Sequence, residues 1–423
     1  MPPPHPDSLT PFPDPTLTGT VIVGMSGGVD SAVAALLLQR DGYAVQGLFM
    51  SNWEDDDDAY CTTADDFQDA RRVCETLGIV LHRVSFAAQY RERVFQLFLR
   101  EYAAGRTPNP DVLCNREIKF GVCLDYMHRL GASRIATGHY AQLRHTSTGT
   151  QLLKATDTAK DQSYFLHGVA AAALGKTLFP IGGLRKTEVR RLAHAAGLPV
   201  YDKPDSTGIC FIGERPFQEF LGRYLRTEPG PIENDAGLVL GEHRGLALYT
   251  LGQRSGLGIG GRAGSAAAPW YVAHKDMARN ALIVVQDQDH PLLLSDAFDV
   301  EQMHWLTPGE VGVEPLDCAV KTRYRQNDLR CTVHPAAAHH AAAEPNVASS
   351  AAALDAQSRA SSDPIWRVNL REPARAVTPG QYAAFYSGAR CLGGGVIAQR
   401  FNSRTAHGAR GITYNSLFSV EGS

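Results

Sequence analysis

The chain has 423 residues, a length that predicts two or three domains. Hydrophobic residues make up 44% and charged residues 20% of it, which is typical of a globular protein with real hydrophobic cores. The net charge of −3 excludes a histone-like, strongly basic binder, although a local basic stripe can still contact nucleic acid.

The N-terminus and the cysteine count indicate the compartment. Residues 1–18 carry seven prolines, with neither the basic nor the apolar region of a signal peptide, and they predict a disordered tail. No apolar run approaches the ~18 residues of a membrane span. Eight cysteines are too few for a disulfide-stapled secreted scaffold. We therefore expect a cytoplasmic protein without membrane contact.

Strands and helices alternate through the first half of the chain. In order, the expected elements are a strand at 21–23, a glycine-rich loop at 24–31, a helix at 32–40, a strand at 43–50, a helix at 62–77, a strand at 79–86, a helix at 90–102, a loop at 106–111, a helix at 115–130 and a strand at 133–137. This alternation predicts an α/β fold with a doubly wound parallel sheet. Ligands bind at the carboxyl ends of such strands, which points to the loop at 24–31, Met50 and residues 138–139.

The pattern of predicted secondary structure changes after residue 215. A helix at 216–225 is followed by glycine turns and short β-type runs at 247–250, 270–273, 282–285, 318–321, 365–370, 382–386 and 391–399. We therefore expect an α/β domain at 19–215, a small central domain at 216–290 and a β-barrel at 291–423. Residues 335–363 hold 12 alanines and 5 serines and predict a low-complexity insertion in that barrel.

The loop Ser26-Gly27-Gly28-Val29-Asp30-Ser31 has the composition of a phosphate site. Glycines let backbone N–H groups approach a phosphate, serine hydroxyls donate further bonds, and the following helix N-terminus adds partial positive charge. No lysine follows the glycines, so the loop is not of the G-x-x-x-x-G-K-[ST] kind. A tight strand-to-helix connection without a ligand is the plain alternative.

Two further segments, 107–115 and 205–215, each contain a cysteine. We expect Cys114 to lie where a loop enters a helix, which stabilises a thiolate, with Asp111 about one turn away as an acid or base. Cys210 lies in a glycine-containing turn, where a sulfur carrier is reachable. Residue type alone leaves open that Cys114 and Cys210 are both buried core residues. We expect five other cysteines to be core residues (Cys74, Cys123, Cys318, Cys331 and Cys391). No zinc-ligand spacing occurs, so we expect no metal site.

These motifs together resemble a known family. The SGGVDS loop is similar to the signature of the ATP pyrophosphatase (PP-loop) superfamily, whose fold is adenine nucleotide α-hydrolase-like. The two cysteine segments resemble those of bacterial tRNA-specific 2-thiouridylases, and further matches lie at 48–54, 137–140, 160–166, 251–254, 256–261, 321–325 and 378–381. The likeness covers roughly residues 20–334 and 364–400.

The resemblance implies a tRNA-uridine 2-sulfurtransferase. ATP adenylates the 2-carbonyl oxygen of the wobble uridine, a persulfide on Cys210 delivers sulfur to that carbon, and Cys114 releases it, which leaves a Cys114–Cys210 disulfide. ATP would contact Gly24, Met25, Ser26, Gly27, Gly28, Val29, Asp30, Ser31, Met50 and Gly138. Mg²⁺ would bridge the phosphates, with Asp30 as a candidate ligand.

The resemblance also implies the RNA contacts and the partners. Asn109, Pro110 and Asp111 would contact the target base, with Asp111 as general acid or base. Contacts to tRNA are implied for His139, Lys160, Asp161, Gln162, Arg323, Tyr324 and Gln381. A cysteine desulfurase or a sulfur-relay protein would load Cys210. By residue type alone, His139 is an ordinary strand-end histidine, and Arg323 alternates with Lys321 and Arg325 on a solvated strand face.

Two alternatives stay open. A PP-loop ligase or amidotransferase would use the same nucleotide chemistry on another acceptor and would not need two reachable cysteines. A non-catalytic tRNA-binding or sulfur-carrier protein would retain the loop only as a vestige, an interpretation that the intact SGGVDS motif disfavours.

Overall fold

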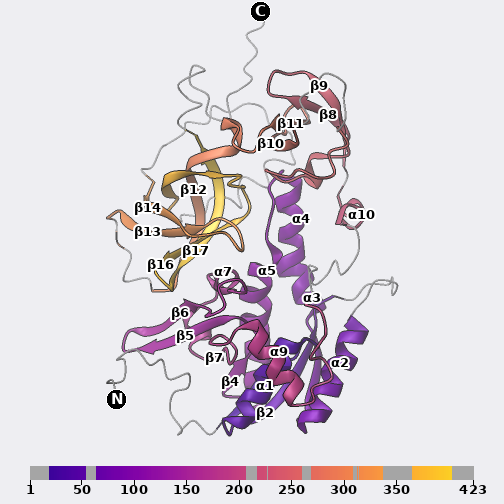
Figure 1. Ribbon diagram of the computed structural model, residues 1–423, viewed down its shortest axis with the longest axis vertical. Helices are drawn as coiled ribbons and strands as arrows, with labels where there is room; N and C mark the ends of the chain where they lie inside the picture. The colour runs from indigo at the N-terminus through magenta and orange to yellow at the C-terminus, as the bar shows by residue number, and fades with distance from the viewer. Residues whose placement is uncertain are drawn as a thin grey trace, which may run out of the picture. The chain divides into compact units, whose positions relative to one another are not determined.

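The computed structural model describes residues 19–53, 63–205, 217–225, 227–259, 268–307, 312, 314–336 and 364–402. These residues belong to two units, described separately below (Figure 1). The first unit comprises residues 1–100, 109–225 and 388–392, and the second comprises 101–108, 226–387 and 393–423. The predicted tail at 1–18 and residues 337–363 of the predicted insertion lie outside the described residues.

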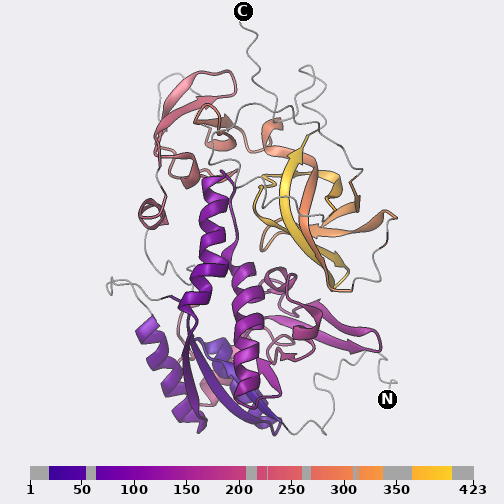
Figure 2. The same cartoon turned by 180° about the vertical axis from the view of Figure 1, so that it is seen from behind.

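The first unit is built on a parallel sheet. Its elements are β1 (Thr20–Gly24), α1 (Val29–Arg40), β2 (Ala44–Ser51), α2 (Thr63–Leu77), β3 (Leu81–Ser85), α3 (Ala87–Tyr90), η2 (Arg91–Phe95), α4 (Gln96–Ala103, whose end belongs to the second unit), α5 (Pro110–Leu113), η3 (Cys114–Val122), α6 (Cys123–Arg129), β4 (Arg134–Ala136), β5 (Ala141–Thr146), β6 (Gly149–Lys154), α7 (Ser163–Leu166), α8 (Ala171–Leu174), β7 (Thr177–Leu178), α9 (Lys186–Ala195) and α10 (Phe217–Gly222). Figure 2 shows the same elements from behind.

The strand order is β3-β2-β1-β4-β7, and every pair in it is parallel. The chain moves outward from β1 through β2 to β3 and then returns to the other side of β1 as β4. A ligand crevice forms at such a switch point, beyond the carboxyl ends of the strands. The predicted parallel sheet is therefore confirmed, and its switch point lies where β1 and β4 end.

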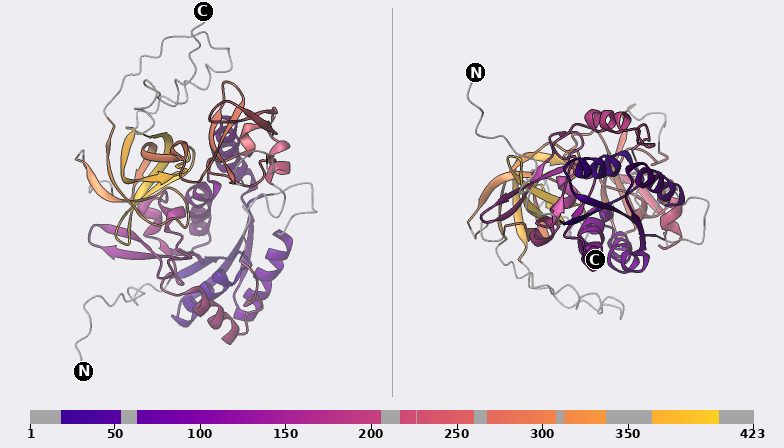
Figure 3. Two further views of the ribbon diagram at one scale, coloured as in Figure 1. Left: turned by 45° about the horizontal axis from the view of Figure 1, so that its top comes forward. Right: turned by 90° about the horizontal axis from the view of Figure 1, so that it is seen from below.

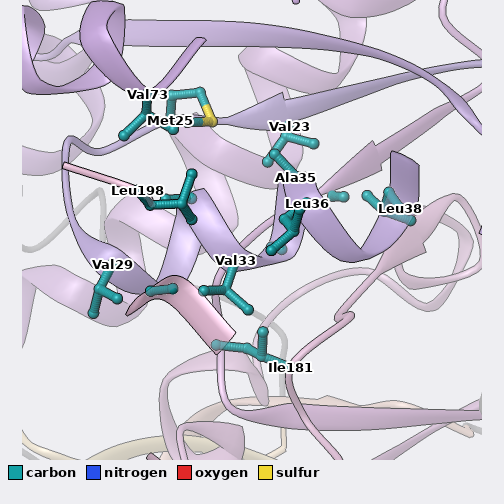
Figure 4. Close-up of a cluster of buried hydrophobic side chains, with 14 of the residues drawn as sticks. Val23, Met25, Val29, Val33, Ala35, Leu36, Leu38, Val73, Ile181 and Leu198 are labelled. Atoms are coloured by element: carbon teal, nitrogen blue, oxygen red, sulfur yellow. The ribbon is translucent and has the colours of Figure 1, made fainter. Parts of the chain in front are cut away.

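Helix α1, which follows the glycine loop, packs through buried apolar side chains (Figure 4). Its alanine- and leucine-rich sequence buries Val33, Ala35 and Leu38 completely, against Val23 of β1 and residues of α2 and α9. Each fully buried leucine or valine side chain contributes about 1.5–3 kcal/mol to folding. This packing fixes where the first turn of α1 points.

The second unit contains two antiparallel-rich sheets. Its elements are β8 (Gly230–Asn234), β9 (Val239–His243), η4 (Leu246–Leu248), β10 (Trp270–Asp276), β11 (Ala281–Gln286), η5 (Pro291–Leu293), β12 (Leu294–Trp305), β13 (Leu316–Lys321), β14 (Leu329–Pro335), β15 (Trp366–Arg375), β16 (Tyr382–Ser387) and β17 (Arg390–Phe401). Strands β10, β11, β8 and β9 form a sheet in that order.

The predicted C-terminal barrel is confirmed. Six strands follow the order β12-β15-β14-β13-β16-β17, and the pairing of β12 with β17 closes the ring, whose strands Figure 3 shows from two further directions. Strand β17 begins in the first unit, where Cys391 is paired with Leu152 of β6. Closure leaves no exposed edge between the six strands.

Three sequence predictions of local structure were wrong. Residues 247–250 are not a strand, because the chain there forms the 3₁₀ turn η4. The helix expected at 115–130 begins at Pro110, where Asn109 caps it. Strand β13 ends at Lys321, so residues 323 and 325 do not continue it.

None of the helices in the described part of the chain is both long and apolar enough to cross a membrane.

Candidate active site

The loop between β1 and α1 is closed by its own hydroxyl groups. Ser31 Oγ accepts the N–H of Ser26 at 3.2 Å and donates to the carbonyl oxygen of Gly28 at 3.1 Å. The two serine hydroxyls lie 3.2 Å apart. The loop is thereby held in a narrow curve at the N-terminus of α1, where backbone N–H groups favour an anion.

Gly27 cannot be replaced without disturbing this curve. Its φ of +75° lies in the left-handed region, and a Cβ added there would lie 2.4 Å from the carbonyl oxygen of Asp66. Lys203 reinforces the same contact, since its Nζ donates to the Gly27 carbonyl oxygen at 3.2 Å and pairs with Asp66 at 2.8 Å and Asp69 at 2.5 Å. Burial lowers the pKa of Lys203, but the two carboxylates outweigh it and raise the pKa, so the amine stays charged.

The ends of β1, β2 and β4 meet beside the loop. A Cβ on Gly138 would lie 2.6 Å from Ser31 N, so the end of β4 abuts the first turn of α1. A Cβ on Gly24 would lie 3.7 Å from Met50 Cε and 3.8 Å from Thr137 Cγ2. The three segments selected from the sequence therefore converge, with Met50 and the β4 end on either side of Gly24.

Asp30, in the first turn of α1, is the centre of a charge network. Lys186 Nζ lies 2.8 Å from each of its carboxylate oxygens, and Tyr140 Oη donates to Oδ1 at 2.8 Å. Burial first, and then the Asp30 charge, raise the pKa of Tyr140, so the phenol keeps its proton. Both Asp30 oxygens therefore have hydrogen-bond donors from this chain.

The same lysine reaches the last residue described before Cys210. Lys186 pairs with Asp205 at 2.7 Å, Lys160 pairs with it at 2.6 Å and Arg190 at 3.3 Å. Burial raises the pKa of Asp205, but the hydrogen bonds and charges of Lys160 and Lys186 outweigh this and lower it to about 2. Residue 205 is thus fixed as an anion, while Cys210 itself lies outside the described residues.

Asp111 and Cys114 share a helix rather than a loop. Asn109 Oδ1 accepts the N–H of Asp111 at 3.1 Å, Pro110 is the first helical residue, and the helix continues through η3 and α6. Cys114 therefore lies in the second turn and is 2% exposed, which corrects the expectation that it sits at the helix entrance. Because the helix-dipole effect fades after the first turn, it does not explain a reactive thiolate there.

The carboxyl group of Asp111 lies in a buried environment that changes its pKa. Burial raises its pKa above the ordinary 3.8, and the positive charge of Lys119 offsets only part of that rise. Asp111 and Cys114 are three residues apart in one helix, and side chains at that spacing lie on the same face. Asp111 and Cys114 are thus on one face of the helix, with the carboxyl group in a buried environment.

Two of the predicted tRNA residues of the first unit, Asp161 and Gln162, make hydrogen bonds to nearby backbone groups of that unit. Asp161 is 4% exposed and accepts from Ala155 N, Ser163 N and Ser163 Oγ, each at 3.1–3.2 Å. Gln162 Oε1 accepts the N–H of Tyr140 at 2.8 Å. In this structure both side chains shape the turn that leads into α7.

His139 follows the end of β4. Thr137 Oγ1 lies 2.7 Å from its Nδ1, and the rings of Phe120 and Phe179 lie at 5.9 Å. Burial, and then the Lys119 charge, hold the pKa of His139 well below its usual value, so the ring is neutral at pH 7. The neutral imidazole is thus packed beside two aromatic rings of the same unit.

The second unit holds the other predicted RNA contacts. Arg323 and Tyr324 lie in the turn between β13 and β14, which is closed by Thr322 N and Oγ1 donating to Gln326 Oε1 at 2.7 and 3.0 Å. The expectation of an alternating strand face for Arg323 was therefore wrong, because β13 ends at Lys321. Arg323 is exposed in this turn.

Gln381 is also used internally. Its Nε2 donates to the carbonyl oxygen of Thr107 at 2.8 Å and lies 3.5 Å from that of Pro108. Thr107 N in turn donates to Pro379 O at 3.0 Å. Within the second unit, this amide holds the segment 101–108, which directly precedes Asn109 in the chain.

Comparison with known proteins decides the family. A protein from Tolumonas auensis named tRNA-specific 2-thiouridylase MnmA is 54% identical over 385 residues, which cover 90% of this chain and 97% of that protein. Proteins with the same name from Methylococcus capsulatus and Verminephrobacter eiseniae are 53% and 55% identical, over 90% and 89% of this chain and 97% and 98% of their own lengths. The chain belongs to the tRNA-specific 2-thiouridylase family.

Family models match the 2-thiouridylase chain in three stretches. These are described as a tRNA methyl transferase HUP domain at residues 19–214, a tRNA methyl transferase PRC-barrel domain at 218–286 and an aminomethyltransferase beta-barrel domain at 346–397. The predicted family and the fold class, a parallel α/β sheet with a central domain and a C-terminal barrel, are thus confirmed.

Sequence reasoning about this 2-thiouridylase missed Lys186 and Tyr140. One signal was present for Lys186, which is the first residue of α9. A cation in the first turn of a helix opposes the helix dipole, so its presence there suggests a specific partner. Tyr140 directly follows the predicted His139, but only the fold shows that its hydroxyl reaches Asp30.

Proposed function

We propose that this chain is a tRNA 2-thiouridylase, which uses ATP and a cysteine persulfide to convert the wobble uridine of tRNA into 2-thiouridine. The observation that carries the proposal is identity above 50% with proteins so named, over about 90% of the chain. In this proposal the glycine loop would serve adenylation, and the helix of Asp111 and Cys114 would serve sulfur transfer together with Cys210. The tRNA and a sulfur-donating protein would be its partners.

The first chemistry is adenylation. The uracil O2 attacks the α-phosphorus of ATP, the bond to the β-phosphate breaks, and pyrophosphate leaves. The backbone N–H groups of the loop and the hydroxyls of Ser26 and Ser31 would hold the leaving pyrophosphate, and Lys186 would offset its charge. Met50 and Gly138 would lie beside the adenine.

The uracil N3 proton must leave during activation and return when the thiocarbonyl forms. Asp111 is proposed as its carrier, because it shares a helix face with Cys114 and burial raises its pKa above the ordinary value. Asn109 and Pro110, which cap and begin the same helix, would place the base beside it.

The second chemistry is sulfur transfer. The terminal sulfur of a persulfide on Cys210 attacks C2, and AMP leaves with the former carbonyl oxygen. The Cys114 sulfur then attacks the inner sulfur on Cys210, breaks its bond to the transferred sulfur, and forms a Cys114–Cys210 disulfide. An external thiol reductant reopens that disulfide, which makes it transient in a reducing compartment.

The part of the chain that the structure describes offers no complete cage for Mg²⁺. Among the described residues, no three His, Cys, Asp or Glu side chains gather as ligands, and Asp30 is paired with Lys186. Mg²⁺ commonly binds through substrate phosphates with one or two carboxylates. We therefore propose that it would arrive with the triphosphate, and we assign no step to it.

Nucleoside mass analysis tests the proposal. Purified protein, tRNA, ATP and a cysteine desulfurase with cysteine are expected to yield 2-thiouridine, and Cys210→Ser is expected to abolish it while pyrophosphate release continues. A ligase or amidotransferase would be unaffected by Cys210→Ser. A non-catalytic tRNA binder would release no pyrophosphate, and either result would contradict the proposal.

A further inference from the structure

Two cysteines outside the candidate site face each other in the barrel. Cys318 on β13 and Cys331 on β14 are direct partners in the antiparallel register, and their sulfur atoms lie 3.6 Å apart. Cys331 is 1% exposed, whereas Cys318 is partly exposed. Sequence reasoning took both for core residues, which the exposure of Cys318 contradicts.

The backbone spacing of such a pair suits a disulfide. Opposite residues on antiparallel strands have Cα atoms about 4.5–5.5 Å apart, inside the range of about 4.4–6.8 Å that disulfides span. The sulfur atoms need to approach by about 1.5 Å from their 3.6 Å separation to reach bonding distance. A metal site is disfavoured, because within the described residues no third acidic, histidine or cysteine ligand joins the pair.

The two thiols are not equivalent. The hydrogen bond with Cys318, and then burial, raise the pKa of Cys331, and either sulfur of the pair can be the donor. Cys318 is the sulfur that a reagent in solvent reaches. Cys318 is therefore placed to react first, and Cys331 to resolve the product.

We propose that Cys318 and Cys331 form a reversible disulfide site that exchanges with low-molecular-weight disulfides of the glutathione class. The Cys318 thiolate attacks one sulfur of the reagent, forms a mixed disulfide and releases one thiolate. The Cys331 sulfur then attacks Cys318, the bond to the second reagent half breaks, and a second thiolate leaves. The protein loses two electrons, the reagent gains them, and the two protein protons pass to the released thiols.

The pair lies in the stem of the hairpin whose turn carries Arg323 and Tyr324. Closure adds a covalent link to strands β13 and β14, which are already hydrogen-bonded, in the part of the hairpin that supports this turn. If the proposed function holds, this turn contacts tRNA, so the redox state of the stem alters tRNA affinity. This consequence rests on the proposed function, whereas the disulfide site itself does not.

The site is tested by peptide mapping. The full chain is equilibrated with mixtures of oxidised and reduced glutathione, quenched in acid, alkylated and digested for mass spectrometry. We expect a Cys318–Cys331 linkage that reduced glutathione reverses. In Cys331→Ser we expect a glutathione adduct on Cys318, and in Cys318→Ser an unmodified Cys331. Cys391→Ser, which removes a buried thiol of β17, is the matched control and keeps the linkage.

Absence of the Cys318–Cys331 linkage under fully oxidising mixtures would overturn the site. Equal reactivity of the two thiols would also overturn it: glutathione would then add to Cys331 in Cys318→Ser as fast as it adds to Cys318 in Cys331→Ser. Cys331→Ala, which keeps the position apolar, repeats the measurement if the serine variant does not fold. The coupling, which is the effect of the disulfide on tRNA binding, is tested by measuring tRNA affinity. Oxidation is expected to change that affinity at least threefold in the parent chain and to leave it unchanged in Cys318→Ser. Linkage formation without that change overturns the coupling alone, and neither result depends on tRNA being thiolated.

Discussion

The carboxyl edge of the parallel sheet and the β13–β14 hairpin of the barrel carry predicted functional residues in different ways. At the sheet edge, the ends of β1, β2 and β4 place the loop, Met50 and Gly138 together, because neighbouring parallel strands end side by side. At the hairpin, Arg323 and Tyr324 lie in a turn after β13 has ended. Strand order thus constrains the first region tightly, whereas turn geometry alone places the second.

Substitution of Lys186 is expected to have the largest effect on the arrangement at the sheet edge. Lys186→Met leaves the Asp30 carboxylate with only the Tyr140 hydroxyl of its two described side-chain donors, and removes one cation from Asp205. Loss of a preorganised charge at a site of this kind costs about 100-fold in rate or more. We expect that loss in tRNA-dependent pyrophosphate release from ATP. Arg191→Met, which removes an exposed cation from the same helix, is expected to leave the rate unchanged, and equal losses in both variants would contradict a specific role.

Asp111→Asn separates catalysis from stability. Thiolation is expected to fall about 100-fold, because the amide cannot carry the N3 proton. A carboxyl group whose folded pKa is raised supports folding fully below its unfolded pKa, near 3.8, and less as pH rises through the folded pKa. The free energy of unfolding of both proteins is measured in urea at a series of pH values from below 3.8 upward. The parent is expected to lose stability relative to Asp111→Asn as the pH rises. A parent that gains stability relative to the variant would contradict the burial argument.

Arg323→Ala tests the hairpin. Loss of one phosphate contact is expected to weaken tRNA binding about tenfold and to lower the slope of log affinity against log salt by about 1. Arg330→Ala, the matched control, removes an exposed arginine from β14 and leaves the turn intact. Filter binding at several salt concentrations distinguishes them, and an identical slope change in both variants would show only a general charge effect.

The smallest effect is expected for Gln381→Leu. The variant loses the hydrogen bond to Thr107 O, which is worth about 1 kcal/mol in the free energy of unfolding. Because the side-chain amide already bonds within the protein, the salt slope of tRNA binding is expected to stay that of the parent. A slope reduced as in Arg323→Ala would instead assign Gln381 to the RNA surface.

Much of the first unit was predictable, because strand and helix periodicity and the glycine loop are local signals. The start of the Cys114 helix was not predicted, although its signal was present: Asn109 is a good capping residue and proline is favoured at the first helical position. The prolines were interpreted only as breakers of a helix.

Other features needed the fold itself. The hairpin of β5 and β6 was missed, because the apolar–polar alternation of Ala141, Gln142, Leu143 and Arg144 covers only four residues before the polar His145 and Thr146. The network of Lys186, Asp30 and Asp205 brings Asp30 into contact with a lysine 156 positions away, and no sequence pattern predicts that contact. The same holds for the opposed sulfurs of Cys318 and Cys331, which depend on strand register.

The account depends most on sulfur transfer between Cys210 and Cys114. The direct measurement is a single turnover with persulfide-loaded protein, ATP and tRNA, without added reductant, followed by non-reducing peptide mapping. A Cys114–Cys210 linkage is expected to accumulate in step with 2-thiouridine and to require both ATP and tRNA. If 2-thiouridine accumulates while both cysteines remain unlinked, or at the parent rate in Cys114→Ser, the mechanism is wrong.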